Sequence, residues 1–222
     1  VPEDIRTVFV CARDIAPDVV RALIAAEDRR FPFHSGIDVF ALGRAVGQAI
    51  VGGKVVSGAS TITQQLVRNI YHFPRTLPSK VAEAWLALRM EATLSKEEIL
   101  VQYLNRVAYG RQAYGIEAAA RFYFDKPARD LSPSEAAYLT VLPRAPGRLR
   151  PERDAAGLRR RRDAILRRMA RLGFLRPDAL GRALSEPVRI SKNVRDFRAP
   201  HFVDYHLSRL PRQEREHQAQ IR

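Results

Sequence analysis

Apolar residues recur at helical spacing along most of the chain, and residues that cap or break helices separate the stretches. A first helix is expected from Pro17, in its first turn, to Glu27, where Val20, Leu23 and Ile24 share one face with Glu27. Glu27 therefore points toward the core, and a carboxylate half-withdrawn from water suits a general base or acid near neutral pH. The alternative is an ordinary solvated or paired glutamate at a helix end.

A second helix is expected from Lys80 to Glu91, where apolar residues cover most of the circumference around Glu83. Such a helix is predicted to be buried, which leaves Glu83 either paired or functional. The alternative is an internal ion pair with Lys80, three residues earlier. One apolar face of this helix consists of Val81, Ala84, Trp85 and Leu88.

Two later helices begin with a capping box. Ser95 with Glu98 opens one of them, and Ser132 with Glu135 opens the next, with Pro133 in its first turn. An apolar stretch from 39 to 56 predicts a short helix that ends at two glycines, 52 and 53. These patterns together predict a mainly α-helical protein.

Between these helices, residues 57–69 form a loop of small residues that runs into a helix rich in hydroxyls and amides. Free backbone N–H groups, the positive end of the helix dipole and Arg68 could hold a phosphate or pyrophosphate there. The alternative is an ordinary N-cap at Ser60 or Thr61, with Gln64 or Gln65 in solvent.

The chain has 222 residues, 46% of them hydrophobic, which is enough for one core with a small second lobe. Cys11 is the single cysteine, so no disulfide frame is expected. No run of apolar residues approaches the length of about 18 that spans a bilayer, and Val1 does not begin a signal peptide.

The net charge is +14, and the excess is arginine that is concentrated between 144 and 182. Such a surface attracts polyanions: nucleic acid, anionic lipid head groups or a pyrophosphate-linked substrate. Aromatic residues make up only 8% and form no stacking array near the arginines, which argues against a nucleic-acid partner. Residues 158–172 predict an amphipathic helix with a basic back at 159–162, either solvated or in contact with lipid.

Several of these residues fall into ordered motifs. The pattern E-D-x-x-F-x-x-H-x-G-x-D is filled by Glu27, Asp28, Phe31, His34, Gly36 and Asp38. The pattern G-x-S-T-x-T-Q-Q-L-x-[KR]-N is filled by Gly58, Ser60, Thr61, Thr63, Gln64, Gln65, Leu66, Arg68 and Asn69. These are motifs one and two of the family fifty-one peptidoglycan glycosyltransferases, which this chain resembles from about residue 17 to 185.

The third motif departs from the family pattern. Relatives usually carry an arginine and a lysine before the glutamate, whereas this chain has Ser79, Lys80 and then Glu83. Ser79 predicts weaker pyrophosphate binding, or the recruitment of Arg75. Motifs four and five resemble 95–105 and 115–124, and we interpret both as mostly scaffold.

The resemblance implies a lysozyme-like glycosyltransferase fold with a large head lobe and a smaller jaw lobe at the membrane. It implies Glu27 as the base that deprotonates the acceptor sugar, and Glu83 as a second catalytic carboxylate on the pyrophosphate side. A divalent cation, Mg or Mn, would be held by Asp28 and Glu83. The expected substrate-binding residues are Asp28, Phe31, His34, Ser60, Thr61, Gln64, Gln65, Arg68, Asn69 and Lys80.

The implied partners are lipid II, the growing glycan strand and the bacterial membrane surface. Residues 1–187 would form the glycosyltransferase domain on the outer face of the inner membrane, with its anchor outside this chain. Residues 188–222 resemble the linker to the transpeptidase domain in penicillin-binding proteins of the 1C type. A lysozyme-like lytic enzyme and a degenerate domain that only binds lipid II remain as alternatives.

Overall fold

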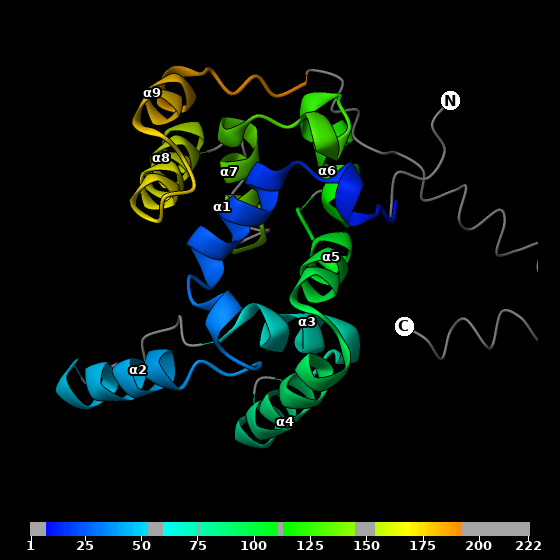
Figure 1. The fold of residues 1–222 in the computed structure, drawn as a ribbon, viewed down its shortest axis with the longest axis vertical. Helices are drawn as coiled ribbons and strands as arrows, with labels where there is room; N and C mark the ends of the chain where they lie inside the picture. Colours follow the sequence, from blue (N-terminus) through cyan, green and yellow to red (C-terminus); the bar gives the residue numbers. More distant parts are fainter. Residues whose placement is uncertain (1–7, 53–59, 75, 111–112, 145–153, 192–222) are drawn as a thin grey trace, which may run out of the picture. The chain divides into compact units, whose positions relative to one another are not determined.

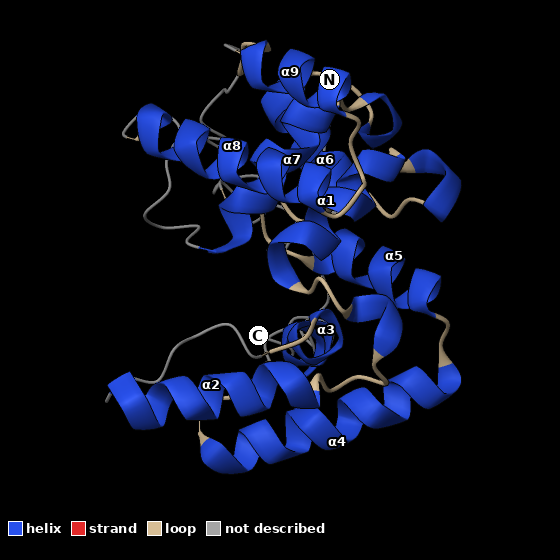
Figure 2. Ribbon diagram, turned by 60° about the vertical axis from the view of Figure 1, so that its left-hand side comes forward, coloured by secondary structure: helices blue, strands red, loops and turns tan. Residues whose placement is uncertain are grey.

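A computed structural model describes residues 8–52, 60–74, 76–110, 113–144 and 154–191. In these ranges the chain is helical, and its β-structure is a single isolated bridge between Ala108 and Tyr114 (Figure 2). The prediction of a mainly α protein is confirmed. The helices are α1 Pro17–Glu27, α2 Val39–Gly52, α3 Ile62–Tyr71, α4 Leu77–Thr93, α5 Lys96–Arg106, α6 Ile116–Phe124, α7 Pro133–Val141, α8 Ala155–Arg171 and α9 Pro177–Ser185.

The core forms where α1 packs against α7 and α8, while α9 covers α8 (Figure 1). Leu23, Leu139, Leu158 and Leu166 are almost completely buried there. The second group of contacts joins α3 to α4 and to α5. Because α1 ends at Glu27 and α3 begins beside it, the two groups meet where the motif residues lie.

Three helices begin with a complete capping box, in which an N-cap hydroxyl accepts the N3 N–H and the N3 side chain accepts the N-cap N–H. The boxes expected at Ser95 and Ser132 are confirmed. At the start of α3 the structure decides between two candidates, since Thr61 is the N-cap and Gln64 closes the box. The helix expected over 39–56 is present from Val39 to Gly52, and its predicted end at Gly52 and Gly53 is not tested, because 53–59 lie outside the described residues.

The prediction that the helix at 80–91 is buried is wrong. The residues of α4 that are buried are Ser79, Glu83 and Ala87, whereas Val81 and Trp85 are 71% and 55% exposed. The helix turns its polar side inward and its apolar side outward. The prediction counted apolar residues around the helix, and such a count does not show which neighbours the helix has. Here the inward side carries Glu83, and the charged Arg68 of α3 lies against it.

The basic back expected on α8 is also partly wrong. Arg159, Arg160 and Arg161 are exposed, but Arg162 retains only 2% of its accessible surface. Its guanidinium donates to the Ser134 hydroxyl at 3.1 Å and to the Glu186 carbonyl at 2.9 Å. Arg162 therefore joins α8 to α7 and to the end of α9.

The chain divides into two units, Val1–Ser191 and Lys192–Arg222, and the second lies outside the described residues. The predicted linker beyond residue 191 and the arginines at 145–153 therefore have no structural account. Within the described ranges, every helix is too short or too polar to cross a membrane. The division into head and jaw lobes stays a prediction.

Candidate functional site

The motif-one loop leaves the end of α1 and is tied to the start of α3. Asp28 follows Glu27 as the C-cap of α1, and its carboxylate accepts the backbone N–H of Ile62 at 3.1 Å. The ring of His34 bridges the same carboxylate to the loop, since Gly36 N–H donates to Nδ1 at 3.2 Å and Nε2–H donates to Asp28 Oδ2 at 3.0 Å. Asp28 and His34 thus hold the loop in place.

Gly36 explains why the loop can pass so close to α4. Its φ is +92°, and a Cβ at this position would lie 2.7 Å from the Ala87 carbonyl oxygen. Only glycine tolerates both the backbone angle and the contact. The Thr61 hydroxyl donates to the Gly36 carbonyl at 2.6 Å, so motifs one and two are joined at this point.

Glu27 is half-buried at the last position of α1 and contacts α3. The amide nitrogen of Gln65 donates to Glu27 Oε2 at 3.1 Å. The amide oxygen of Gln65 accepts the Tyr103 hydroxyl at 3.1 Å. Because α5 supplies this hydroxyl, the Gln65 amide has one orientation and presents its N–H groups to the carboxylate.

Glu83 is 2% exposed and accepts hydrogen bonds from two cations. Arg68 contacts both carboxylate oxygens, through Nε at 2.7 Å and Nη2 at 2.8 Å, and Lys80 Nζ contacts Oε2 at 2.9 Å. Burial by itself would raise the pKa of Glu83, but these hydrogen bonds and charges outweigh it and the pKa is lowered. The same hydrogen bonds raise the pKa of Arg68. The cluster is therefore two cations around one carboxylate, with a net positive charge.

Of the other substrate-binding candidates, Ser60 is in contact with this cluster. Lys80 Nζ approaches the Ser60 hydroxyl at 3.5 Å, and Asn69 is half-buried next to Arg68 on α3. Gln64 is engaged in the capping box, where its Oε1 accepts the Thr61 N–H at 3.0 Å. Phe31 is 1% exposed and supports the loop from below.

Ser79 occupies the position where relatives usually have an arginine. It lies in the first turn of α4, 8% exposed, with its hydroxyl 2.8 Å from the hydroxyl of the N-cap Thr76. A buried serine cannot replace the charge of an arginine, so Arg68 and Lys80 carry the positive charge of this cluster. Arg75, the suggested substitute, lies outside the described residues.

The family profile described as transglycosylase matches residues 3–170. The chain belongs to the transglycosylase family. It is 40% identical to penicillin-binding protein 1A of Pseudomonas aeruginosa over 194 residues, which is 86% of this chain and 24% of that protein. It is also 40% identical to penicillin-binding protein 1C of Escherichia coli over 193 residues, which is 87% of this chain and 25% of that protein.

A solved structure supports the fold of this chain. Penicillin-binding protein 1A from Haemophilus influenzae superimposes with a TM-score of 0.55 and 22% identity, over 95% of this chain and 22% of that one. The family assigned from the motifs is confirmed. The chain spans about a quarter of the length of the curated relatives it matches.

The described residues do not fit a metal site held by protein ligands alone. Both oxygens of Glu83 are taken by Arg68 and Lys80, and Asp28 is engaged by Ile62 and His34. Within these ranges, no group of three His, Cys, Asp or Glu side chains could hold a cation. The divalent cation stays a prediction, and no step below depends on it.

Sequence reasoning missed two contacts that support Glu27. Arg168 of α8 donates to the carbonyls of Ala25 and Ala26 at 3.1 and 3.5 Å, at the end of α1 just before Glu27. A cation there satisfies the last carbonyls and the negative end of the helix dipole. The second contact is the Tyr103 hydroxyl of α5, which donates to the Gln65 amide oxygen at 3.1 Å. Neither contact leaves a local signal, because the partners lie far apart in the sequence.

Proposed function

We propose that this transglycosylase domain is a peptidoglycan glycosyltransferase of cell-wall synthesis, which polymerises lipid II into β-1,4-linked glycan and releases undecaprenyl pyrophosphate. One observation carries the proposal. A single helix, α3, holds a carboxylate through Gln65 and a cationic cluster through Arg68, three residues later and on the same face. A base beside an anion site is the arrangement that a sugar acceptor and a pyrophosphate leaving group require.

Glu27 is the proposed base. It takes the proton from the 4-hydroxyl of the acceptor N-acetylglucosamine as that oxygen attacks the anomeric carbon of the donor N-acetylmuramic acid. The bond from that carbon to the pyrophosphate oxygen breaks, and the α configuration inverts to β. A base on the acceptor side of the reacting carbon and cations on the leaving-group side suit such an inverting displacement.

Arg68 and Lys80 are the proposed pyrophosphate contacts, because positioned cations stabilise the charge that develops on the leaving group. Glu83 has a lowered pKa, which makes it a poor proton donor near neutral pH. We therefore assign it the orientation of Arg68 and Lys80. The leaving pyrophosphate needs charge neutralisation more than a proton, so Arg68 and Lys80 are sufficient for its departure in this proposal.

The remaining predicted contacts divide by position. Ser60 and Asn69, beside the cationic cluster, are proposed to touch sugar or phosphate. Gln65 is proposed to orient Glu27 toward the acceptor. The other predicted substrate-binding residues, Asp28, Phe31, His34, Thr61 and Gln64, act in this proposal by shaping motif one and the start of α3.

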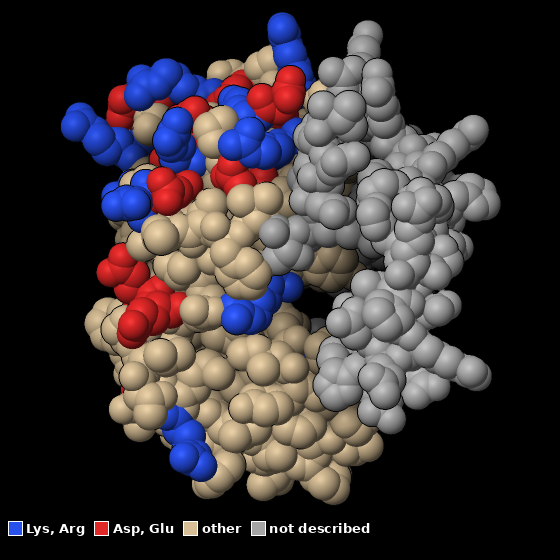
Figure 3. Space-filling model, turned by 90° about the vertical axis from the view of Figure 1, so that its right-hand side faces the viewer, with Lys and Arg blue, Asp and Glu red and all other residues tan. Residues whose placement is uncertain are grey.

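The proposed location is the outer face of the bacterial inner membrane, with a transpeptidase domain following in the full-length protein. Relatives about four times longer than this chain support the further domain. Apolar side chains that face outward support the membrane contact, and Figure 3 shows few charges over the part where Figure 1 places α4. The exposed apolar residues of α2 and α4 are Val39, Phe40, Leu42, Leu77, Val81, Trp85 and Leu88.

Polymerisation of fluorescent lipid II in detergent tests the proposal. The assay compares the wild-type chain with Glu27→Gln and Glu83→Gln, each with a divalent cation and with a chelator. The matched control is Glu97→Gln, which changes an exposed carboxylate of α5. Wild type and control should give ladders of lengthening glycan, and Glu27→Gln should lower the rate by about 100-fold or more.

Other outcomes identify the alternatives. Shortening of preformed glycan, with no elongation of lipid II, would indicate a lytic enzyme. Binding of lipid II without polymer in every variant would indicate a degenerate domain. An unchanged rate in Glu27→Gln would contradict the assignment of the base.

A further inference from the structure

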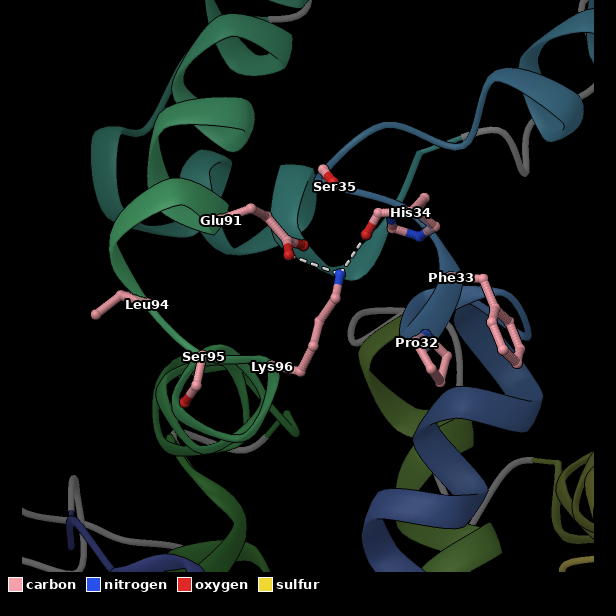
Figure 4. A pocket seen from close by; sticks show the side chains of 8 residues that line it. All are labelled: Pro32, Phe33, His34, Ser35, Glu91, Leu94, Ser95 and Lys96. Carbon is pink, nitrogen blue, oxygen red and sulfur yellow. Dashed lines mark hydrogen bonds and ion pairs between the residues drawn. The ribbon is translucent and has the colours of Figure 1, made fainter.

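Lys96, the first residue of α5, lies where three motif-bearing segments meet. Its Nζ donates to the His34 carbonyl of motif one at 2.5 Å and to Glu91 Oε2 near the end of α4 at 2.6 Å (Figure 4). Glu91 Oε1 accepts the hydroxyl of Thr63, in the first turn of α3, at 2.6 Å. We call Lys96, Glu91, Thr63 and the His34 carbonyl the Lys96 cluster.

The cluster is shielded enough for these contacts to be strong. The Glu91 side chain is 5% exposed and the Lys96 side chain is 32% exposed. Lys96 Nζ also lies 4.3 Å from the centre of the buried Phe31 ring, within cation–π range. Hydrogen bonds between charged partners are shorter and stronger than neutral ones. The cluster therefore resists separation of the segments it joins.

Two short paths connect the cluster to Glu27. Along motif one, Lys96 holds the carbonyl of His34, and the His34 ring holds the carboxylate of Asp28, which follows Glu27 in the chain. Along α3, Thr63 lies two residues before Gln65, which donates to Glu27. The first path sets the position of the base, and the second sets the position of its hydrogen-bond donor.

The cluster also reaches the second carboxylate. Glu91 lies eight residues after Glu83 on α4, and Thr63 lies five residues before Arg68 on α3. A contact between Thr63 and Glu91 therefore sets how α3 and α4 slide past each other. The bidentate contact of Arg68 with Glu83 forms only at one position of α3 along α4, because both hydrogen bonds are short, at 2.7 and 2.8 Å.

We propose that Lys96 is a positioning residue for the transfer reaction, which holds motif one, α3 and α4 so that Glu27 meets Gln65 and Glu83 meets Arg68. Motif four therefore contributes to catalysis as well as to the scaffold. Lys96 acts through its contacts with the His34 carbonyl and with Glu91. Glu91 in turn contacts Thr63 of α3. The expected change in kcat rests on the proposed function, whereas the contacts of the Lys96 cluster do not.

A second lysine provides a matched control. Lys126 donates to Glu135 at 2.9 Å, with side-chain exposures of 35% and 11%. The two pairs thus resemble each other in chemistry and burial, but Glu135 belongs to the capping box of α7. Lys126→Met should cost stability in the same way as Lys96→Met without changing the geometry around Glu27.

The experiment measures kcat and KM for lipid II with the 222-residue chain and its Lys96→Met, Lys96→Arg and Lys126→Met variants. Lys96→Met should lower kcat by about 10-fold to 100-fold, because a small displacement of a reacting group has an effect of that order. KM should rise by a smaller factor than kcat falls, since Arg68 and Lys80 keep their positive charges even if Arg68 is displaced. Lys96→Arg keeps the charge and should recover most of kcat, and Lys126→Met should keep the wild-type kcat.

Amide hydrogen exchange provides a readout that needs no substrate. Lys96→Met should speed exchange in 28–38 and 60–66, whereas Lys126→Met should leave both segments unchanged. Equal kcat in Lys96→Met and wild type, or equal losses in both methionine variants, would overturn the proposal. If wild type makes no polymer, unchanged exchange in Lys96→Met overturns it, and faster exchange in 28–38 supports it. If Lys96→Met does not fold, Glu91→Gln and Thr63→Val replace it with the same expectations.

Discussion

Helices α4 and α8 are equally long, but they place apolar and polar residues in opposite ways. In α8, Leu166 and Met169 are fully buried, while most of the arginines face solvent. In α4, Glu83 is buried, while Val81 and Trp85 are exposed. One helix follows the pattern of a soluble globular protein, and the other reverses it.

The difference shows what each helix is for. The buried side of α8 packs against α1 and α7, so its apolar stripe stabilises the fold. The buried side of α4 carries the carboxylate that orders Arg68 and Lys80, so its inward face belongs to the site. The outward face of α4 exposes apolar side chains, which agrees with the proposed membrane contact.

The largest expected effect concerns Arg162, which is buried among the exposed arginines of α8. Arg162→Met should lower the free energy of unfolding by about 3 to 5 kcal/mol, because its hydrogen-bond partners would stay buried without a donor. Arg161→Met removes an exposed arginine of the same helix and should change the free energy of unfolding by at most about 0.5 kcal/mol. Denaturant unfolding of both variants measures the difference. Equal losses would show that Arg162 does not hold α7, α8 and α9 together.

Leucine truncation compares the two apolar faces directly. Leu166→Ala on α8 should cost about 2 to 5 kcal/mol of unfolding free energy, because the leucine is completely buried. Leu88→Ala on α4 should cost less than about 1 kcal/mol, since Leu88 is 45% exposed. Denaturant unfolding in the absence of lipid is the measurement. A large loss in Leu88→Ala would mean that the outward face of α4 is packed against protein.

Acid should weaken the inward face of α4. The pKa of Glu83 is lowered in the folded chain from its ordinary value of 4.5, so its contribution to stability is complete above that value. This contribution disappears as the pH falls through the lower folded-state pKa. The difference in unfolding free energy between wild type and Glu83→Gln should therefore shrink on acidification. A difference that is constant with pH would contradict the pairing with Arg68 and Lys80.

The smallest effect concerns the outward face. Trp85 is the single tryptophan of the chain and is 55% exposed, so its fluorescence reports on α4 alone. Binding to vesicles that contain anionic lipid should shift its emission to shorter wavelength. Val81→Ser, which leaves the tryptophan in place, should weaken binding by at most about 10-fold. Emission that stays constant while the chain binds vesicles would exclude α4 from the lipid contact.

Much of the fold could be predicted from the sequence, because helix starts and ends are local. Ser95 and Ser132 were each placed correctly as N-caps from residues within four positions of them. The candidate site was also predictable in part, since Glu83 was expected to be buried and either paired or functional, with Lys80 as the candidate partner. Its pairing with Lys80 is a contact within one turn, whereas its pairing with Arg68 joins two helices and was not predicted.

The sequence by itself determined the helices, their caps and the side chains available for chemistry, because these depend on residues a few positions apart. Tertiary structure decided which side of α4 faces inward, that Arg162 is buried among exposed arginines, and that Lys96 joins three segments. These outcomes depend on partners in different segments, such as Arg68 and Glu83, which are 15 positions apart, and Lys96 and His34, which are 62 apart. Burial and ion pairing are set by the neighbours that packing brings together, and no local pattern contains them.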